Sequence, residues 1–189
     1  INDLMNAGVN LPVKRIDRKP DSKVADEFAK AKKEMGKPVQ CGVPSLLATH
    51  TVVLYKYLAD HGKSLNLGVG SDKDVLAIAV PPPKSPVFLK RKNARNIKAS
   101  FEQSLPWADV VETQNFGHVA WYSKDVMKWP KGHVECIVIA TDKAIKEKAD
   151  ALKEVIYYLH KAGLDIESAR KEGGFEMSKI ADMIQKHIP

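Results

Sequence analysis

Residues 36–62 read GKPVQCGVPSLLATHTVVLYKYLADHG, and this stretch decides how the chain folds. The apolar run at residues 38–43 predicts a buried strand, and residues 44–50 form a short loop of small and polar residues. An amphipathic helix is expected over residues 51–61, ending at Gly62. In such a unit the free N–H groups of the helix N-terminus face the carboxyl end of the strand, where small anions bind.

Polar side chains at this junction are candidate ligands. Ser45, Thr49 and His50 place hydrogen-bond donors beside the predicted helix N-terminus. A lone histidine near a helix start is more often structural than a ligand. The position of His50 at a strand–loop–helix junction gives the two interpretations similar weight. The stretch therefore indicates a binding site more readily than a catalytic centre.

Strands and helices alternate along the rest of the chain. Residues 75–80 are continuously apolar and lie between Asp74 and three prolines, which is typical of a buried strand in a parallel sheet. The alternation predicts an α/β fold whose mostly parallel sheet carries helices on both faces. Further strands are expected at residues 96–101, 118–123 and 133–140, and helices at residues 22–35, 84–93, 106–116, 141–162, 165–172 and 176–187.

The composition is that of a folded protein with a basic balance. The 189 residues are 44% hydrophobic and 28% charged, which suits one domain or two small lobes. The net charge is +7, but acidic residues are interspersed with the basic ones in the predicted helices. The densest basic run, at residues 90–98, predicts a solvated helix face. Without aromatic residues interleaved in a basic stripe, nucleic acid is not an expected partner.

Motifs for catalysis, nucleotides or metals are not present in the sequence. None of the six histidines forms HxH or HExxH, so neither a metal site nor a cofactor is expected. Neither GxGxxG, GxxxxGK[ST] nor GxSxG occurs. Cys41 and Cys136 lie in predicted strands and are interpreted as buried thiols, and two cysteines do not decide whether a disulfide joins them. The apolar runs are too short to span a bilayer.

A resemblance rests on segments that follow one another in a particular order. They are residues 36–62, DKDVLAIAVPPP at 72–83, the Pro106-Trp107 helix start, the stretch from Trp129 to Ile156, and the tail IADMIQKHIP at 180–189. In order and spacing they resemble the substrate-binding proteins of ABC importers for nitrate, bicarbonate, sulfonates and related solutes, the NMT1/THI5-like group.

This resemblance implies an α/β fold of the periplasmic-binding-protein-like type 2, in which two lobes with mostly parallel sheets enclose the ligand. Residues 1–130 would form the second lobe. Residues 131–189 would form the return segment of the first lobe and the C-terminal helices. The chain would thus be a fragment whose first lobe is incomplete, and the strand at residues 133–140 would find no partner strand within it.

The resemblance also implies site residues. Thr49 and His50 correspond to a Thr-His pair that contacts the ligand, and Lys131 corresponds to an anion-contacting position near the hinge. Trp107 corresponds to the tryptophan of a Glu-Pro-Trp motif, in which Leu105 replaces the glutamate here. With Ser45, these residues form the expected ligand-binding set.

The function that the resemblance implies is not enzymatic. The chain would be the solute-binding component of an ABC importer and would capture a small, anionic solute such as nitrate, bicarbonate or a sulfonate. Its partner would be a membrane permease, and its location periplasmic or extracytoplasmic with a membrane anchor. Two alternatives remain open, a metabolic enzyme for small molecules on the same scaffold and the ligand-sensing domain of a signalling protein.

Overall fold

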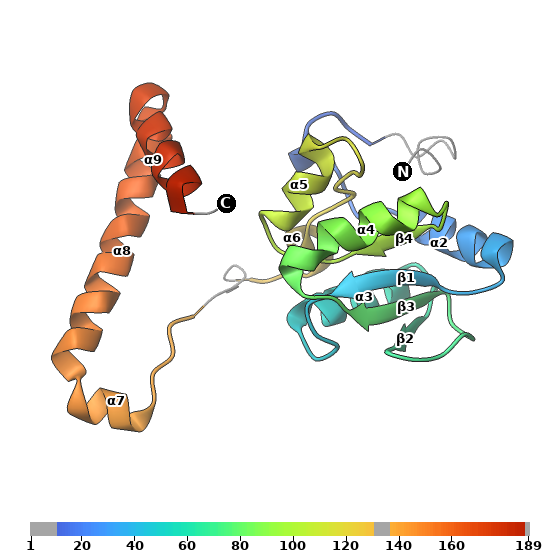
Figure 1. Cartoon of the computed structure of the whole chain (residues 1–189), viewed down its shortest axis with the longest axis horizontal. Helices are drawn as coiled ribbons and strands as arrows, with labels where there is room; N and C mark the ends of the chain where they lie inside the picture. Colours follow the sequence, from blue (N-terminus) through green and yellow to red (C-terminus); the bar gives the residue numbers. More distant parts are fainter. Residues whose placement is uncertain (1–10, 131–136, 188–189) are drawn as a thin grey trace. The chain divides into compact units, whose positions relative to one another are not determined.

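A computed structural model describes residues 11–130 and 137–187 (Figure 1). The chain divides into two compact units, Ile1–His133 and Val134–Pro189, and each is described by itself.

The first unit is built on a four-stranded parallel sheet with the strand order β2-β3-β1-β4. The two inner strands are β1 (Val39–Val43) and β3 (Val75–Ala79). The outer strands are β2 (Leu65–Leu67) and β4 (Ala99–Phe101). Because all four run in the same direction, their carboxyl ends lie on one edge of the sheet, at the arrowheads in Figure 1.

Helices cover both faces of this sheet. On one face, α2 (Ser22–Met35) and α3 (Thr49–Asp60) pack against Cys41 and Val43 of β1. On the other face lies α4 (Ser85–Ala94), whose Lys92 donates to the Gln40 side chain over 2.5 Å. Side chains of a strand alternate between faces, so Gln40 and Cys41 point to opposite layers. The expected arrangement of a parallel sheet between two helical layers is therefore present in this unit.

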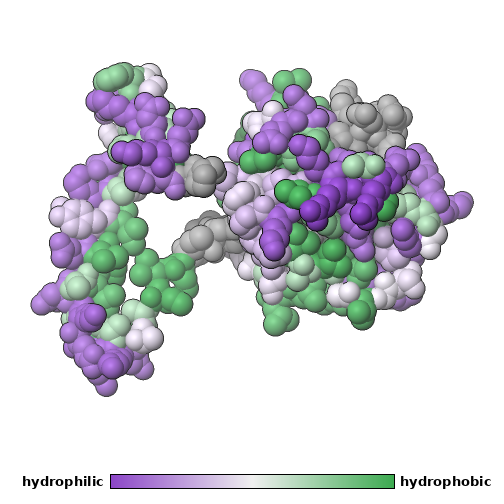
Figure 2. Space-filling model, viewed as in Figure 1, coloured by the Kyte–Doolittle hydropathy of each residue, from purple (hydrophilic) through white to green (hydrophobic). Residues whose placement is uncertain are grey.

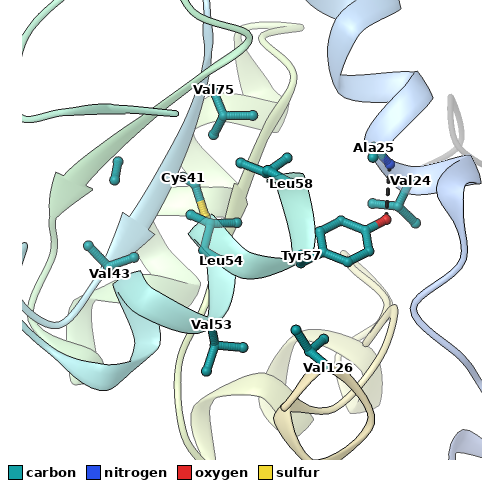
Figure 3. Packing of buried hydrophobic residues seen from close by; sticks show 11 residues of the cluster. Val24, Ala25, Cys41, Val43, Val53, Leu54, Tyr57, Leu58, Val75 and Val126 are labelled. Carbon is teal, nitrogen blue, oxygen red and sulfur yellow. Dashed lines mark hydrogen bonds between the residues drawn. The ribbon is translucent and has the colours of Figure 1, made fainter. Parts of the chain in front are cut away.

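Tyr57 joins α3 to α2 in the core of the first unit (Figure 3). Its ring is fully buried in a cluster of side chains from α2, α3, β1 and β3. Its hydroxyl donates to the Asp21 carbonyl over 2.8 Å and accepts from the Ala25 N–H over 3.0 Å. Asp21 is also the N-cap of α2, since its carboxylate accepts from the Lys23 N–H. Tyr57 thus fixes the start of α2 against α3.

An ion-pair network attaches the segment before α2 to α5 (Trp107–Thr113). Arg18 is only 4% exposed and donates twice to the Glu112 carboxylate, over 2.8 Å each. It also donates to the carbonyls of Pro12 and Val119. The Glu112 carboxylate accepts from the Val119 N–H as well. Hydrogen bonds from Arg18 and Val119 lower the pKa of Glu112 to about 2, and they outweigh the burial of the carboxylate, which by itself would raise this pKa.

The short helical turns of the first unit complete its description. They are η1 (Arg15–Asp17), η2 (Pro82–Lys84) and α6 (Ser123–Val126). Val126 of α6 joins the core cluster beside α3.

The second unit contains α7 (Asp142–Glu147), α8 (Ala149–Glu172) and α9 (Gly174–His187). Thr141 caps α7 by accepting from the Ala144 N–H. Helix α8 ends at Gly173, whose φ of 67° suits a glycine, and α9 packs against α8. More than half of the large apolar side chains that are exposed in the described residues belong to this unit.

Several sequence predictions were confirmed and some were wrong. The strands at β1, β3 and β4 and the helices α2 to α5 lie within a few residues of the expected ranges. Strand β2 was missed, because a three-residue Leu-Asn-Leu strand in a loop gives too short a pattern. The predicted edge strand at residues 118–123 is wrong. Both backbone polar groups of Val119 bond to Arg18 and Glu112 instead of a ladder.

Two predictions in the second unit also need correction. Residues 137–140, the described part of the strand expected at residues 133–140, form no strand and are exposed. No strand in the described ranges pairs with them, and a lone segment cannot form a ladder. Residues 133–136, which include Cys136, lie outside the described residues. The helices expected at residues 141–162 and 165–172 are not separated, since α8 continues through Gly163 to Glu172.

The Glu112→Gln substitution tests the ion-pair network. The lowered pKa corresponds to about 3 kcal/mol of stability at neutral pH. Because the folded pKa lies below the unfolded one, this contribution is complete above pH ~4.5 and is lost as the pH falls toward 2. Urea unfolding should therefore show the variant clearly less stable than the parent at pH 7, and the difference should shrink to well under about 1 kcal/mol as the pH reaches 2. The exposed Asp60→Asn change should cost less than about 0.5 kcal/mol.

Tyr57→Phe removes the hydroxyl and keeps the ring. The Ala25 N–H and the Asp21 carbonyl then lose a buried partner, which should cost about 1–3 kcal/mol. Thermal or urea unfolding measures this loss. Tyr158→Phe on α8 is the matched control, because its ring is exposed, and an equal loss in both variants would contradict the role assigned to Tyr57.

Candidate functional site

The loop between β1 and α3 has a defined shape. The Ser45 carbonyl accepts from the Ala48 N–H over 3.1 Å and from the Thr51 hydroxyl over 2.8 Å. The Ser45 hydroxyl accepts from the Leu47 N–H over 3.3 Å. Thr51 is buried, so its hydroxyl holds the loop from inside the first turn of α3. These bonds fix the path of residues 44–48 at the carboxyl edge of the sheet.

The N-terminus of α3 has no side-chain cap of its own. Its N-cap residue is Ala48, which makes no side-chain hydrogen bond to the helix. Alanine is a poor N-cap because it offers no acceptor to the first free N–H groups. The positive end of the helix dipole is therefore available to an anionic group from outside the loop. Thr49 is exposed and His50 half-buried in this first turn.

The connections after β1 and β3 leave the sheet toward opposite faces. The chain passes from β1 into α3 on one face and from β3 through η2 into α4 on the other. The Val80 N–H still bonds to the Val43 carbonyl over 2.8 Å, so the two strands separate directly after this bond. Such a divergence is a topological switch point, where open α/β sheets bind ligands at the carboxyl edge.

Gln103 also lies at this edge, and sequence reasoning missed it. It follows β4, and its side-chain amide donates to the Val80 carbonyl over 3.0 Å. This bond fixes the amide orientation, because only the NH₂ group can donate to a carbonyl. Its side-chain oxygen is buried and has no hydrogen-bond partner among the described residues. A single glutamine after a three-residue strand carries no signal that sequence reasoning could have used.

Gly42 lets these strand ends approach closely. A Cβ atom at Gly42 would lie 3.1 Å from a Val80 methyl group and 3.4 Å from the Phe101 Cβ. The strands on either side of β1 thus fill the space that a side chain would need. This packing places Gln103, two residues beyond Phe101, next to the ends of β1 and β3.

The predicted site residues fall into three groups. Ser45, Thr49 and His50 lie together at the β1–α3 junction. Trp107 is the half-buried first residue of α5, after β4, so it follows a neighbouring strand of the same sheet. The Leu105–Pro106 bond before it is cis. Lys131 lies outside the described residues.

The described residues do not offer a metal centre. No group of three or more His, Cys, Asp or Glu side chains within residues 11–130 and 137–187 is placed to hold an ion. The Cys41 thiol is buried, and this desolvation raises its pKa to about 12. A thiol in this state is protonated at neutral pH and is a poor nucleophile.

The fold and this edge define an α/β domain with a candidate ligand site at a switch point of a parallel sheet. A family model described as the NMT1-like family matches residues 3–180. The chain therefore belongs to the NMT1-like family, which is a family of binding proteins and indicates a solute-binding role. The α/β fold with a parallel sheet is consistent with a periplasmic-binding-protein-like fold.

Searches of the curated proteins and of the solved structures found no match for this chain. None of the helices described in the structure is long and apolar enough to cross a membrane.

Thr51→Val tests how the junction is held. The change keeps the size of the side chain and removes the hydroxyl that donates to the Ser45 carbonyl. We expect a loss of about 1 kcal/mol in the free energy of unfolding. Thr113→Val is the control, since its hydroxyl bonds within α5 on an exposed surface and should matter little. Equal effects of the two changes in urea unfolding would show that the loop does not depend on Thr51.

Proposed function

We propose that the chain is the solute-binding component of an ABC importer and that it captures a small anionic solute at the carboxyl edge of the sheet in the first unit. One observation carries this proposal, the N-terminus of α3 at the switch point, whose N-cap Ala48 offers no side-chain acceptor. Membership of a binding-protein family supports it. The solute would bind with Ser45, Thr49 and His50, and with Trp107 and Lys131 from other segments.

The chemistry of this edge suits binding without reaction. Hydroxyl and imidazole groups and helix N–H groups donate hydrogen bonds to a negative oxygen, and a lysine adds a positive charge. Such donors hold an anion when they are fixed in place before it arrives. The hydrogen bonds around Ser45 supply that rigidity. None of these steps requires a proton transfer or a nucleophile.

The two units would belong to different lobes of the complete binding protein. In this proposal residues 1–130 form the second lobe, and residues 131–189 are the return segment of an incomplete first lobe. The exposed apolar side chains of the second unit support it, since Ile137, Val138 and Ile139 are each more than half exposed. A β-branched run followed by amphipathic helices normally packs on a sheet. The solute would then be captured outside the cytoplasm and passed to a permease in the membrane.

Calorimetric titration tests this function. We expect one of nitrate, bicarbonate or an alkylsulfonate to bind. His50→Ala and Lys131→Ala should each weaken that affinity at least about tenfold, because each removes a charge-assisted hydrogen bond. His160→Ala on the exposed surface of α8 is the matched control and should leave affinity unchanged.

Two results would count against the assignment. If none of these solutes binds the full-length protein, the anionic solute is wrong. If a solute binds and both the His50→Ala and Lys131→Ala variants retain parent affinity, the solute-binding role stands and the site lies elsewhere.

A further inference from the structure

The positive charge of this protein is concentrated on one face of the first unit. Residues 75–101 contain six basic residues and no acidic residue, against a net charge of +7 for the whole chain. Outside this segment, basic and acidic residues therefore almost balance. Helix α4 lies within it and is the only α-helix of the described ranges without an acidic side chain.

These charges lie together on the surface, and we call them the basic face. Figure 2 shows strongly hydrophilic side chains over α4. The helix has ten residues and is about 15 Å long. Lys37 extends the face beyond the helix, since Lys37 and Arg95 both act electrostatically on Lys92. The members of the basic face are Lys37, Lys84, Lys90, Arg91, Lys92 and Arg95.

The basic face lacks the ion pairs that lysines make elsewhere in this protein. Across the described residues, none of its six members pairs with a carboxylate, whereas Lys98 nearby bonds to Glu34 over 2.6 Å. Lys23, Lys30 and Lys56 on the opposite helical layer each have an acidic partner. Burial and the charges of Lys37 and Arg95 lower the pKa of Lys92. Like charges held together without counter-charges favour an external anionic partner.

An apolar side chain lies among these charges. Val87 is 51% exposed and lies three or four residues from Lys84, Lys90 and Arg91 along the helix. Residues at these spacings are neighbours on a helix surface. The exposed Pro83 precedes them. The basic face therefore combines positive charge with a small apolar contact.

The aromatic rings nearby are not open for base stacking. Lys92 lies over the Phe88 ring at 5.5 Å and Lys90 over the Phe116 ring at 5.3 Å. Single-stranded nucleic acid would need free aromatic faces between the charges. A protein partner would need a shape-matched surface much larger than one short helix. A bilayer with anionic lipids requires neither free aromatic faces nor a large shape-matched surface. Lysines and arginines are attracted to its headgroups, and an apolar side chain enters the boundary between headgroups and acyl chains.

We propose that the basic face binds the surface of a membrane that contains anionic lipids. The face runs along α4, whereas the candidate solute site begins at α3 on the other side of the sheet. Contact of α4 with a bilayer thus leaves the β1–α3 junction uncovered. This inference does not depend on which solute the chain binds.

Vesicle flotation with the whole chain tests it. Binding is expected to vesicles of phosphatidylcholine mixed with phosphatidylglycerol, to fall as salt rises, and to be undetectable with phosphatidylcholine alone. The triple variant Lys84→Gln, Arg91→Gln and Arg95→Gln should lose about 100-fold in affinity, since each charge near the surface contributes severalfold. All three side chains are exposed, and circular dichroism checks that the variant is folded.

The matched control removes the same number of charges from the opposite layer. Lys23→Gln, Lys30→Gln and Lys56→Gln are exposed changes on α2 and α3 and should alter vesicle affinity less than about threefold. Val87→Ser should weaken vesicle binding severalfold and leave binding to duplex DNA unchanged.

Three results would overturn the proposal. The first is equal binding, or no binding, to the two kinds of vesicle. The second is an equal loss in both triple variants, which would mean that net charge alone acts. The third is tighter binding to duplex DNA than to anionic vesicles at the same salt, which would assign the basic face to nucleic acid.

Discussion

Strand β1 has to be covered on every side, and the first unit is arranged around that requirement. It pairs with β3 along its whole length on one edge and with β4 at residues 40–42 on the other. Cys41 and Val43 need an apolar layer on one face, which α2 and α3 supply. Gln40 and Gly42 face the other layer, where α4 lies. Because the helices that follow β1 and β3 go to different faces, the carboxyl edge opens between them.

The candidate site is a consequence of this arrangement. A helix that follows a central strand brings its N-terminus to the edge where the neighbouring strand turns away. The loop that connects them is fixed by its own hydrogen bonds, and its N-cap is an alanine. Gln103, which follows β4, adds a side-chain amide at the same edge, and its hydrogen bond to the Val80 carbonyl holds it in place. Three chain segments distant in sequence therefore contribute to one surface.

The sequence predicted the central elements of the fold because their patterns are local. A continuous apolar run between Asp74 and three prolines predicts a buried strand. Gly36 and Gly62 mark the ends of α2 and α3, where the backbone adopts a positive φ. The same local reasoning failed where residues distant in sequence determine the backbone structure. The local pattern around Val119 predicted an edge strand. In the structure, Arg18, which is 101 residues away, donates a hydrogen bond to the Val119 carbonyl. No pattern near Val119 reveals that partner.

The residues of the candidate site that are close in sequence could also be predicted, and those brought together by the fold could not. Ser45, Thr49 and His50 follow one strand, so their proximity could be read from the sequence. Gln103 could not be found, since its position depends on the pairing of β4 with β1 and on a bond to Val80. Trp107 and Lys131 entered only through the family resemblance, because nothing local to either residue indicates a ligand.

The charge pattern differs between the two faces of the sheet, one of which carries the candidate solute site and the other the basic face. On the α3 side, surface lysines pair with carboxylates and the helix N-terminus carries the local positive potential. On the α4 side, the six members of the basic face have no carboxylate partner among the described residues, whereas Lys98 beside them pairs with Glu34. Self-repulsion among them costs stability, so a surface of this kind is expected to persist only where a negative partner offsets it. A sheet with helices on both faces allows this, because each layer can carry its own charge pattern while the shared core stays apolar.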